Sequence, residues 1–224
     1  MNFLSHYYFE RYAANSEQVL GGLLPDLLKN IDKSYSFQLH KFESNVPRGQ
    51  KNESITEGWR RHLEVDKLFH SSDFFYHHTH EMRKIIDQNI SDLPVRATFL
   101  AHISLELLLD YKLIDHELLS VSRLYEHLEH VDRNNLSKYL QTLEGVNQES
   151  FFNFYDRFLA SKYIFDYAIV ENIPHALFNI CKRVWDFTPS THHFEVLTMQ
   201  LEDYQQNELK DFMEIYVDIA QQLD

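Results

Sequence analysis

Apolar residues recur at helical spacing along most of the chain. This pattern predicts helices at about residues 2–14, 17–30, 54–70, 94–114, 115–130, 133–143, 148–169 and 174–186, one more beginning near residue 73, a short helix or turn at 34–43, and a final helix after Ser190 that runs to the C-terminus. No segment alternates apolar and polar residues over the length of a strand, and no hairpin dipeptide stands out. The sequence therefore predicts an all-α multi-helix bundle, with residues 1–224 forming a single helical domain.

Two helix starts and one interruption of the apolar pattern stand out. Asn15-Ser16 is expected to cap the second predicted helix. The second predicted helix contains Gly21-Gly22 and Pro25, which are unfavourable inside helices. They predict a kink, or a close approach of two backbones, beside Asp26. The helix at 54–70 is predicted to begin with a capping box, in which Ser54 pairs with Glu57.

Composition is typical of a globular helical protein. The 224 residues are 44% hydrophobic, and five Gly and five Pro are too few for a turn-rich β fold. The single Cys181 cannot form an internal disulfide, which suits a reducing cytosol, so a cytoplasmic location is expected. The first residues show no signal peptide, and no apolar run is long enough to predict a membrane span. The oligomeric state does not follow from the sequence.

The net charge of −13 is unevenly distributed. Residues 1–100 hold 12 Lys and Arg against 13 Asp and Glu, whereas residues 101–224 hold 9 against 21. Nonspecific binding to nucleic acid is not expected of so acidic a chain. An acidic protein partner is expected to dock on the first half, where Arg60 and Arg61 lie.

Two stretches carry candidate metal ligands at helical spacing. His62, Asp66 and His70 are spaced i, i+4, i+8, so one face of a helix carries all three. His102, Glu106 and Asp110 repeat this spacing in an almost wholly apolar stretch. Because burying ionised carboxylates without partners is very costly, a metal ion shared by the two helices would balance them. The alternative is that these are structural residues, since a chain with 14 His offers many chance pairs with acids.

Several short segments, in the same order and at similar spacing, resemble the acyl carrier protein phosphodiesterase family. They are Asn2-Phe3-Leu4-Ser5-His6, Leu20-Gly21-Gly22-Leu23-Leu24-Pro25-Asp26, Gly58 with His62 and Asp66, Glu106 with Asp110, and Asp166-Tyr167 with Arg183. The likeness covers about residues 1–187. The chain departs from the family pattern at Leu63, His70, Ser72 and Tyr111, and His102 is an added candidate ligand.

The resemblance implies an all-helical hydrolase of lipid and fatty-acid metabolism, distantly similar to the HD-type metal phosphohydrolases. Such an enzyme removes the 4′-phosphopantetheine arm from holo-acyl carrier protein, with Mn²⁺ or Mg²⁺. Under this interpretation the expected metal ligands are Asp26, His62, Asp66, His70 and Asp110. His6, His102 and Glu106 are expected to act in catalysis, as further ligands, as residues that orient the ligands or, for His6, as a proton donor. Arg60 and Arg61 are expected to hold phosphate or the acidic carrier protein.

Other functions remain open at this stage. The chain is alternatively a divergent helical metalloprotein, either another phosphoester hydrolase or a di-metal oxidase, since carboxylates and His on facing helices serve that chemistry too. The usual Glu-x-x-His spacing of such oxidases is absent. A third hypothesis is that the chain is a nonenzymatic helical binding protein whose polar pairs are structural. Metal content separates these hypotheses.

Overall fold

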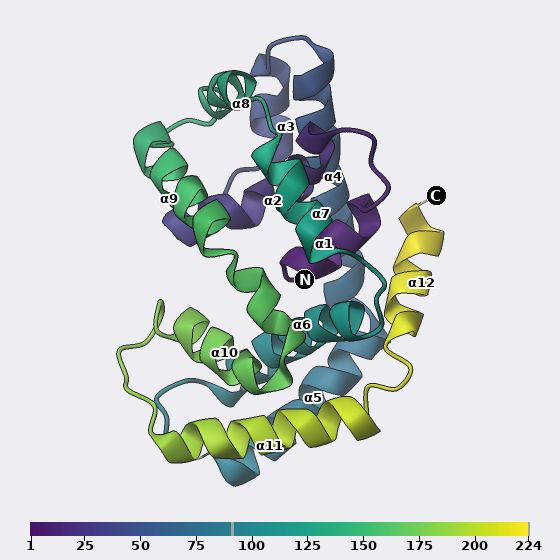
Figure 1. Cartoon of the computed structure of the whole chain (residues 1–224), viewed down its shortest axis with the longest axis vertical. Helices are drawn as coiled ribbons and strands as arrows, with labels where there is room; N and C mark the ends of the chain where they lie inside the picture. The colour runs from purple at the N-terminus through teal and green to yellow at the C-terminus, as the bar shows by residue number, and fades with distance from the viewer. Residues whose placement is uncertain (91, 224) are drawn as a thin grey trace. The chain divides into compact units, whose positions relative to one another are not determined.

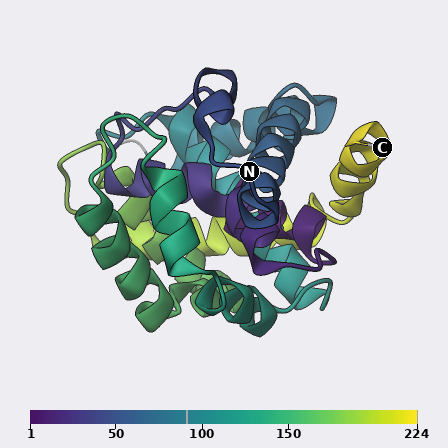
Figure 2. The ribbon, with the colours of Figure 1, turned by 90° about the horizontal axis from the view of Figure 1, so that it is seen from above.

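The protein is built from helices and the loops that connect them (Figure 1). The computed structural model describes residues 1–90 and 92–223, and this part of the chain contains no β-strand (Figure 2). The helices are α1 (Phe3–Glu10), α2 (Ser16–Ile31), α3 (Leu39–Phe42), η1 (Glu43–Asn45), α4 (Gln50–His70), α5 (Asp73–Asn89), α6 (Ala97–Asp115), α7 (Val121–Glu129), α8 (Arg133–Leu140), α9 (Gln148–Ser161), η2 (Tyr163–Ala168), η3 (Val170–Asn172), α10 (Ile173–Cys181), α11 (Thr191–Asn207) and α12 (Met213–Leu223). The predicted all-α class is confirmed.

The chain divides into two compact units. Unit 1 comprises Met1–Ser5, Lys67–Leu118 and the C-terminal segment from Ile164, and unit 2 comprises His6–Asp66 and Leu119–Tyr163. The single domain expected from the sequence stays a prediction. No helix among the described residues combines the length and apolar character that crossing a membrane requires.

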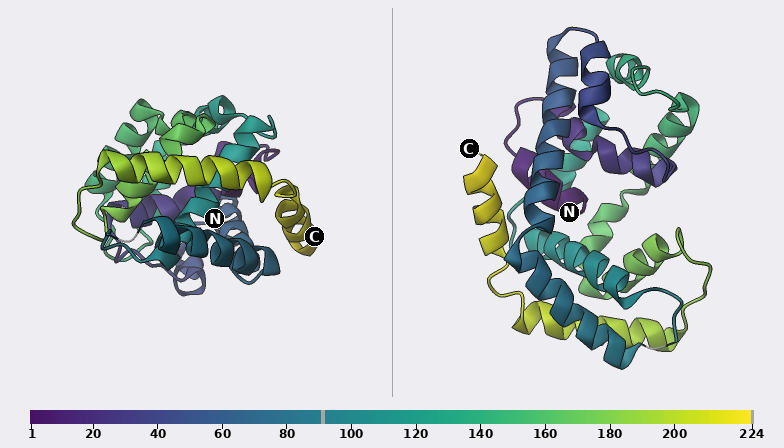
Figure 3. Two further views of the ribbon diagram at one scale, coloured as in Figure 1. Left: turned by 90° about the horizontal axis from the view of Figure 1, so that it is seen from below. Right: turned by 180° about the vertical axis from the view of Figure 1, so that it is seen from behind.

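Helix α6 is the centre of unit 1. Helices α5, α10 and α11 all pack against it, and α11 is the long helix drawn in yellow-green in Figure 3. Because the residues of α6 are apolar nearly all round, Leu105, Leu108 and Leu109 are fully buried. The Ser72 and Ser190 side chains cap the N-termini of α5 and α11, as their positions in the sequence indicate.

Helix α2 organises unit 2. It packs against α7 and α9, and Asn15 caps its N-terminus as predicted. Glycines on both helices mark its contact with α4. A Cβ atom built on Gly21 of α2 would lie 2.2 Å from the carbonyl oxygen of Ile55, and one built on Gly58 of α4 would lie 2.1 Å from the carbonyl oxygen of Gln18. Helix α2 is therefore continuous, and Gly21 and Gly58 are explained by a close backbone approach, which only glycine permits at these positions.

Several predicted boundaries are wrong, and each has a local cause. Helix α4 begins at Gln50, so Ser54 lies inside it and does not cap it. The helix predicted at 148–169 ends at Ser161, because Lys162 adopts a left-handed backbone with φ of 50°. The final predicted helix is divided into α11 and α12, and its last residue, Asp224, lies outside the described residues.

Candidate metal centre

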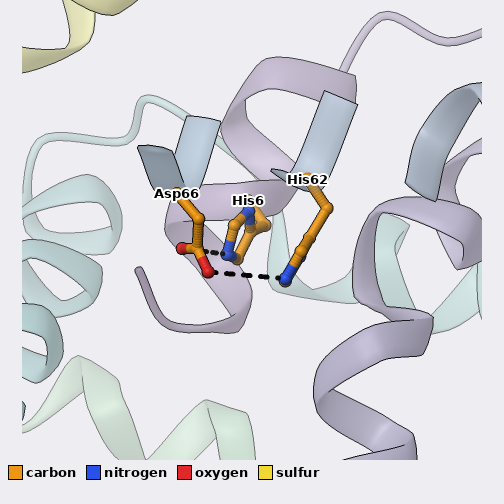
Figure 4. Close-up of side chains that lie close together, drawn as sticks. All are labelled: His6, His62 and Asp66. Carbon is orange, nitrogen blue, oxygen red and sulfur yellow. Dashed lines mark ion pairs between the residues drawn. The ribbon is translucent and has the colours of Figure 1, made fainter. Parts of the chain in front are cut away.

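Four of the predicted site residues come together within unit 2. Helix α1 supplies His6, α2 supplies Asp26, and α4 supplies His62 and Asp66, which lie one turn apart. Figure 4 shows Asp66 facing the two imidazole rings. The ring nitrogen Nε2 of His6 is 3.2 Å from Oδ1 of Asp66, and Nε2 of His62 is 3.7 Å from Oδ2. Both Nε2 atoms are also 4.0 Å from a carboxylate oxygen of Asp26.

These distances fit donors arranged around one cation. Ligand atoms about 2.1 Å from a metal lie about 3.0–3.4 Å apart when adjacent and about 4.2 Å apart when opposite. One donor atom from each of His6, His62 and Asp66 lies within 4.8 Å of the other two. Asp26 lies at the outer limit of this range and would need a small movement to coordinate directly.

The backbone of α2 fixes the orientation of the His62 ring. Nδ1 of His62 lies 2.9 Å from the carbonyl oxygen of Gly22 and must donate the proton, because a carbonyl only accepts. The lone pair of the ring is therefore on Nε2, which faces Asp66. A hydrogen bond of this kind fixes both tautomer and ring orientation in metal-binding histidines.

The ring of His6 is buried without the hydrogen bonds that burial normally demands. Its side chain is 1% exposed and stacks on His62, with ring centroids 3.8 Å apart. Neither ring nitrogen makes an aligned hydrogen bond within the described chain, although Nε2 lies close to Asp66. Buried polar atoms left in this state point to an absent partner, and a cation would satisfy Nε2.

Electrostatics favour the ligand forms of two of these residues. Burial and the charge of His6 hold the pKa of His62 well below its ordinary range, so the imidazole is neutral. Burial alone would raise the pKa of Asp66, but the close approach of His6 holds that pKa well below its usual range. Burial raises the pKa of Asp26, and only part of this effect is offset by His6.

The other predicted ligands lie in unit 1. His70, His102 and Glu106 form a second group of potential metal ligands, contributed by α4 and α6. The sequence predicts that Asp66 and Asp110 share one metal ion. Asp66 lies in unit 2 and Asp110 in unit 1, and their sharing of a metal stays a prediction.

Asp110 belongs to neither group, and its carboxylate is occupied by the first turn of α1. Its oxygens accept hydrogen bonds from the backbone N–H groups of Leu4 and Ser5, at 3.0 and 2.8 Å, and from the Ser5 hydroxyl at 2.7 Å. Burial nevertheless raises the pKa of Asp110 to about 7, against the effect of these bonds. Such bonds are those of a carboxylate that caps a helix N-terminus.

The two predicted phosphate-binding residues differ in their surroundings. Arg60 is exposed and paired with Glu57 at 2.7 Å and Glu43 at 3.2 Å. It lines a pocket of about 600 Å³ together with Gln18 and several residues between 43 and 57, all of the same unit. Arg61 is partly buried and lies near the buried carboxyl group of Glu10.

Two buried acids, Glu10 and Glu17, were missed by the sequence analysis, and Glu10 is the one that follows His6 on the same helix. Glu10, on α1 one turn after His6, accepts a hydrogen bond from Gln18 at 2.7 Å, while its Oε1 has no partner among the described residues. Burial raises the pKa of Glu10 to about 7. A single acid at the end of a short helix gives no signal by which the sequence could have revealed this burial.

Comparison with known protein families, with characterised proteins and with solved structures gives no match to this chain.

Proposed function

We propose that this protein is a metal-dependent phosphodiesterase whose centre is formed by His6, Asp26, His62 and Asp66. The observation that carries the proposal is the convergence of two imidazoles and two carboxylates from three helices, at 3.2–4.0 Å, around a buried His6 ring without aligned hydrogen bonds. Mixed nitrogen and oxygen donors of this kind suit Mn²⁺, and the two carboxylates also suit Mg²⁺.

In this proposal each residue of the centre has a distinct role. A divalent metal held here would lower the pKa of a bound water and neutralise the oxygens of a phosphodiester. His62 and Asp66 are the primary ligands, because one is neutral and oriented by Gly22 while the other is charged. His6 lies against both of them and either completes the ligand set or donates a proton to the leaving oxygen.

The proposed substrate is holo-acyl carrier protein, cleaved at the serine phosphodiester that holds its 4′-phosphopantetheine arm. Three of the segments that resemble the acyl carrier protein phosphodiesterases end in the residues of this centre: His6, Asp26, and the His62–Asp66 pair. The glycines of those segments are the ones that let α2 and α4 approach closely. This agreement between motif and geometry supports the substrate class, and a cytoplasmic location goes with it.

The direct test uses the purified full chain, holo-acyl carrier protein and Mn²⁺, with the mass of the carrier followed by mass spectrometry. Hydrolysis returns the apo carrier, whose mass is lower by the whole arm. Asp66→Asn is expected to abolish turnover, because it removes the charged ligand while keeping the shape of the side chain. Glu64→Gln is the matched control, since Glu64 lies on the same helix and is exposed.

The variants, the substrate and the bound metal together distinguish the possible functions. Equal loss of activity in Asp66→Asn and Glu64→Gln would contradict a specific role for Asp66. A protein that binds Mn²⁺ and hydrolyses a simple aryl phosphodiester, but leaves the carrier intact, would retain the chemistry and lose the named substrate. Coupled iron in place of Mn²⁺ would indicate an oxidase, and no bound metal would indicate a binding protein.

A further inference from the structure

A second group of ligand-type side chains lies wholly within unit 1. His70 is the last residue of α4, and His102 and Glu106 lie one turn apart on α6. Nε2 of His70 is 3.1 Å from Nε2 of His102, and these atoms are 3.4 and 2.9 Å from Oε1 of Glu106. Three donor atoms therefore form a nearly equilateral triangle.

This triangle has the dimensions of one face of a metal coordination shell. Donors about 2.1 Å from a cation and at right angles to one another lie about 3.0 Å apart. Two imidazoles and one carboxylate on a single face leave the remaining positions open, which is the donor set of catalytic zinc sites and of non-haem iron sites. Mg²⁺ prefers oxygen ligands and fits this set poorly.

The protonation of the two rings decides what the three donor atoms can do. When both rings carry the proton on Nε2, both N–H groups are directed at Oε1 of Glu106 and lie against each other, with 3.1 Å between the two nitrogens; when a ring carries it on Nδ1, its Nε2 offers a lone pair to a cation. Oε1 of Glu106 also lies 3.1 Å from the amino group of Met1, which occupies part of its accepting capacity. A cation on the triangle would satisfy both imidazole lone pairs and the carboxylate oxygen together.

The surrounding packing holds the two rings in place and leaves them reachable. The ring of Phe75, on α5, has its centroid 5.0 Å from those of both His70 and His102. Phe69 contacts the ring of His70 from the preceding position, with centroids 5.1 Å apart. The His70 and His102 side chains are 34% and 35% exposed, whereas Glu106 is 10% exposed. Fixed rings at a solvent-accessible edge are what an open metal site requires.

We propose that His70, His102 and Glu106 bind a divalent first-row transition metal, such as Zn²⁺, at a second site distinct in its residues from the His6–His62–Asp66 cluster. This inference does not depend on the proposed phosphodiesterase activity. The second site has one carboxylate, whereas the first site has two, Asp66 and Asp26. The two sites are therefore expected to differ in metal preference.

The test measures zinc binding to the chelator-treated full chain by equilibrium dialysis and metal analysis. His102→Ala and Glu106→Gln are each expected to lose one equivalent of Zn²⁺, or to bind it at least about 100-fold more weakly. Asp66→Asn, in the other cluster, is expected to keep that equivalent. The control His80→Ala removes an exposed imidazole from α5 of the same unit and should bind zinc as the wild type does.

A spectroscopic measurement keeps the test decisive if a variant fails to fold. Long-range ¹H–¹⁵N spectra of the wild type should show the Nε2 signals of His70 and His102 shifting with Zn²⁺, and not with Mg²⁺ at the same concentration. Unchanged zinc content in folded Glu106→Gln, or Nε2 signals that ignore Zn²⁺, would overturn the proposal.

Discussion

Replacing Gly58 with Ala should damage the contact between α2 and α4 that supports the candidate centre. A Cβ atom at this position would lie 2.1 Å from the carbonyl oxygen of Gln18 and 2.7 Å from the backbone nitrogen of Gly22. Cβ atoms essentially never approach other atoms within 3.0 Å. Because both obstacles are backbone atoms, the two helices themselves must separate, by about 1 Å, in an interior that is tightly packed.

The expected loss of stability follows from two opposing effects. Overpacking a core costs about 1–3 kcal/mol and occasionally more, and a backbone obstacle places Gly58→Ala at the upper end. The better helix propensity of alanine returns about 1 kcal/mol. The net loss is therefore about 2 kcal/mol, which for a chain of this length lowers the melting temperature by about 4–8 °C.

Thermal unfolding followed by circular dichroism measures this loss, and Gly22→Ala is the control. A Cβ atom on Gly22 would lie 3.3 Å from the flexible side chain of Glu10 and at an ordinary contact distance, 3.9 Å, from the carbonyl oxygen of Gly58, so the change should stay within about 1 kcal/mol. Gly58→Ala should also weaken Mn²⁺ binding, because the hydrogen bond of His62 to Gly22 crosses the same interface. Wild-type stability in Gly58→Ala, or a larger loss in Gly22→Ala, would refute this reasoning.

Two further predictions concern titration and charge. Burial raises the pKa of Glu10 from 4.5 to about 7, so its contribution to stability is fully present below pH 4.5 and is lost as pH rises through 7. In urea unfolding, the wild type should therefore lose about 3 kcal/mol of unfolding free energy over this pH range, and Glu10→Gln should not. Parallel pH profiles of the two proteins would contradict this prediction. Reversing Arg60 and Arg61 to Glu should slow association with acyl carrier protein, most strongly at low salt, in a stopped-flow measurement. Association rates equal to those of the wild type would rule out docking at these residues.

The helical class could be predicted because the signal is local. Apolar periodicity and side-chain caps such as Asn15, Ser72 and Ser190 act within a few residues of one another. The errors fell where a boundary has no compositional marker. Lys162 takes a left-handed conformation that usually belongs to glycine, and α4 begins at Gln50, one turn before the predicted cap Ser54.

The glycine pair inside α2 indicated a close backbone approach as one possibility, without identifying the partner helix. The sequence left a kink and a close approach as alternatives. The structure shows the close approach, and the backbone that α2 meets is that of α4 at Gly58. Gly58 lies more than 30 residues away from Gly21 in the sequence. A long-range contact of this kind has no local signature, so the periodicity of α2 alone could not identify it.

The division of the two ligand triplets follows from helix geometry. A residue and its neighbour at i+4 lie on adjacent turns, but residues at i and i+8 are separated by about 12 Å along the helix axis, which is far for two ligands of one ion. The i, i+4 pairs His62–Asp66 and His102–Glu106 accordingly stay together, and each is joined by a side chain from another helix, His6 in one case and His70 in the other. The third member of each triplet leaves its pair: His70 joins the second group, and Asp110 caps the first turn of α1. Helical spacing therefore identifies pairs of candidate ligands, whereas the third candidate ligand of each group is set by tertiary packing.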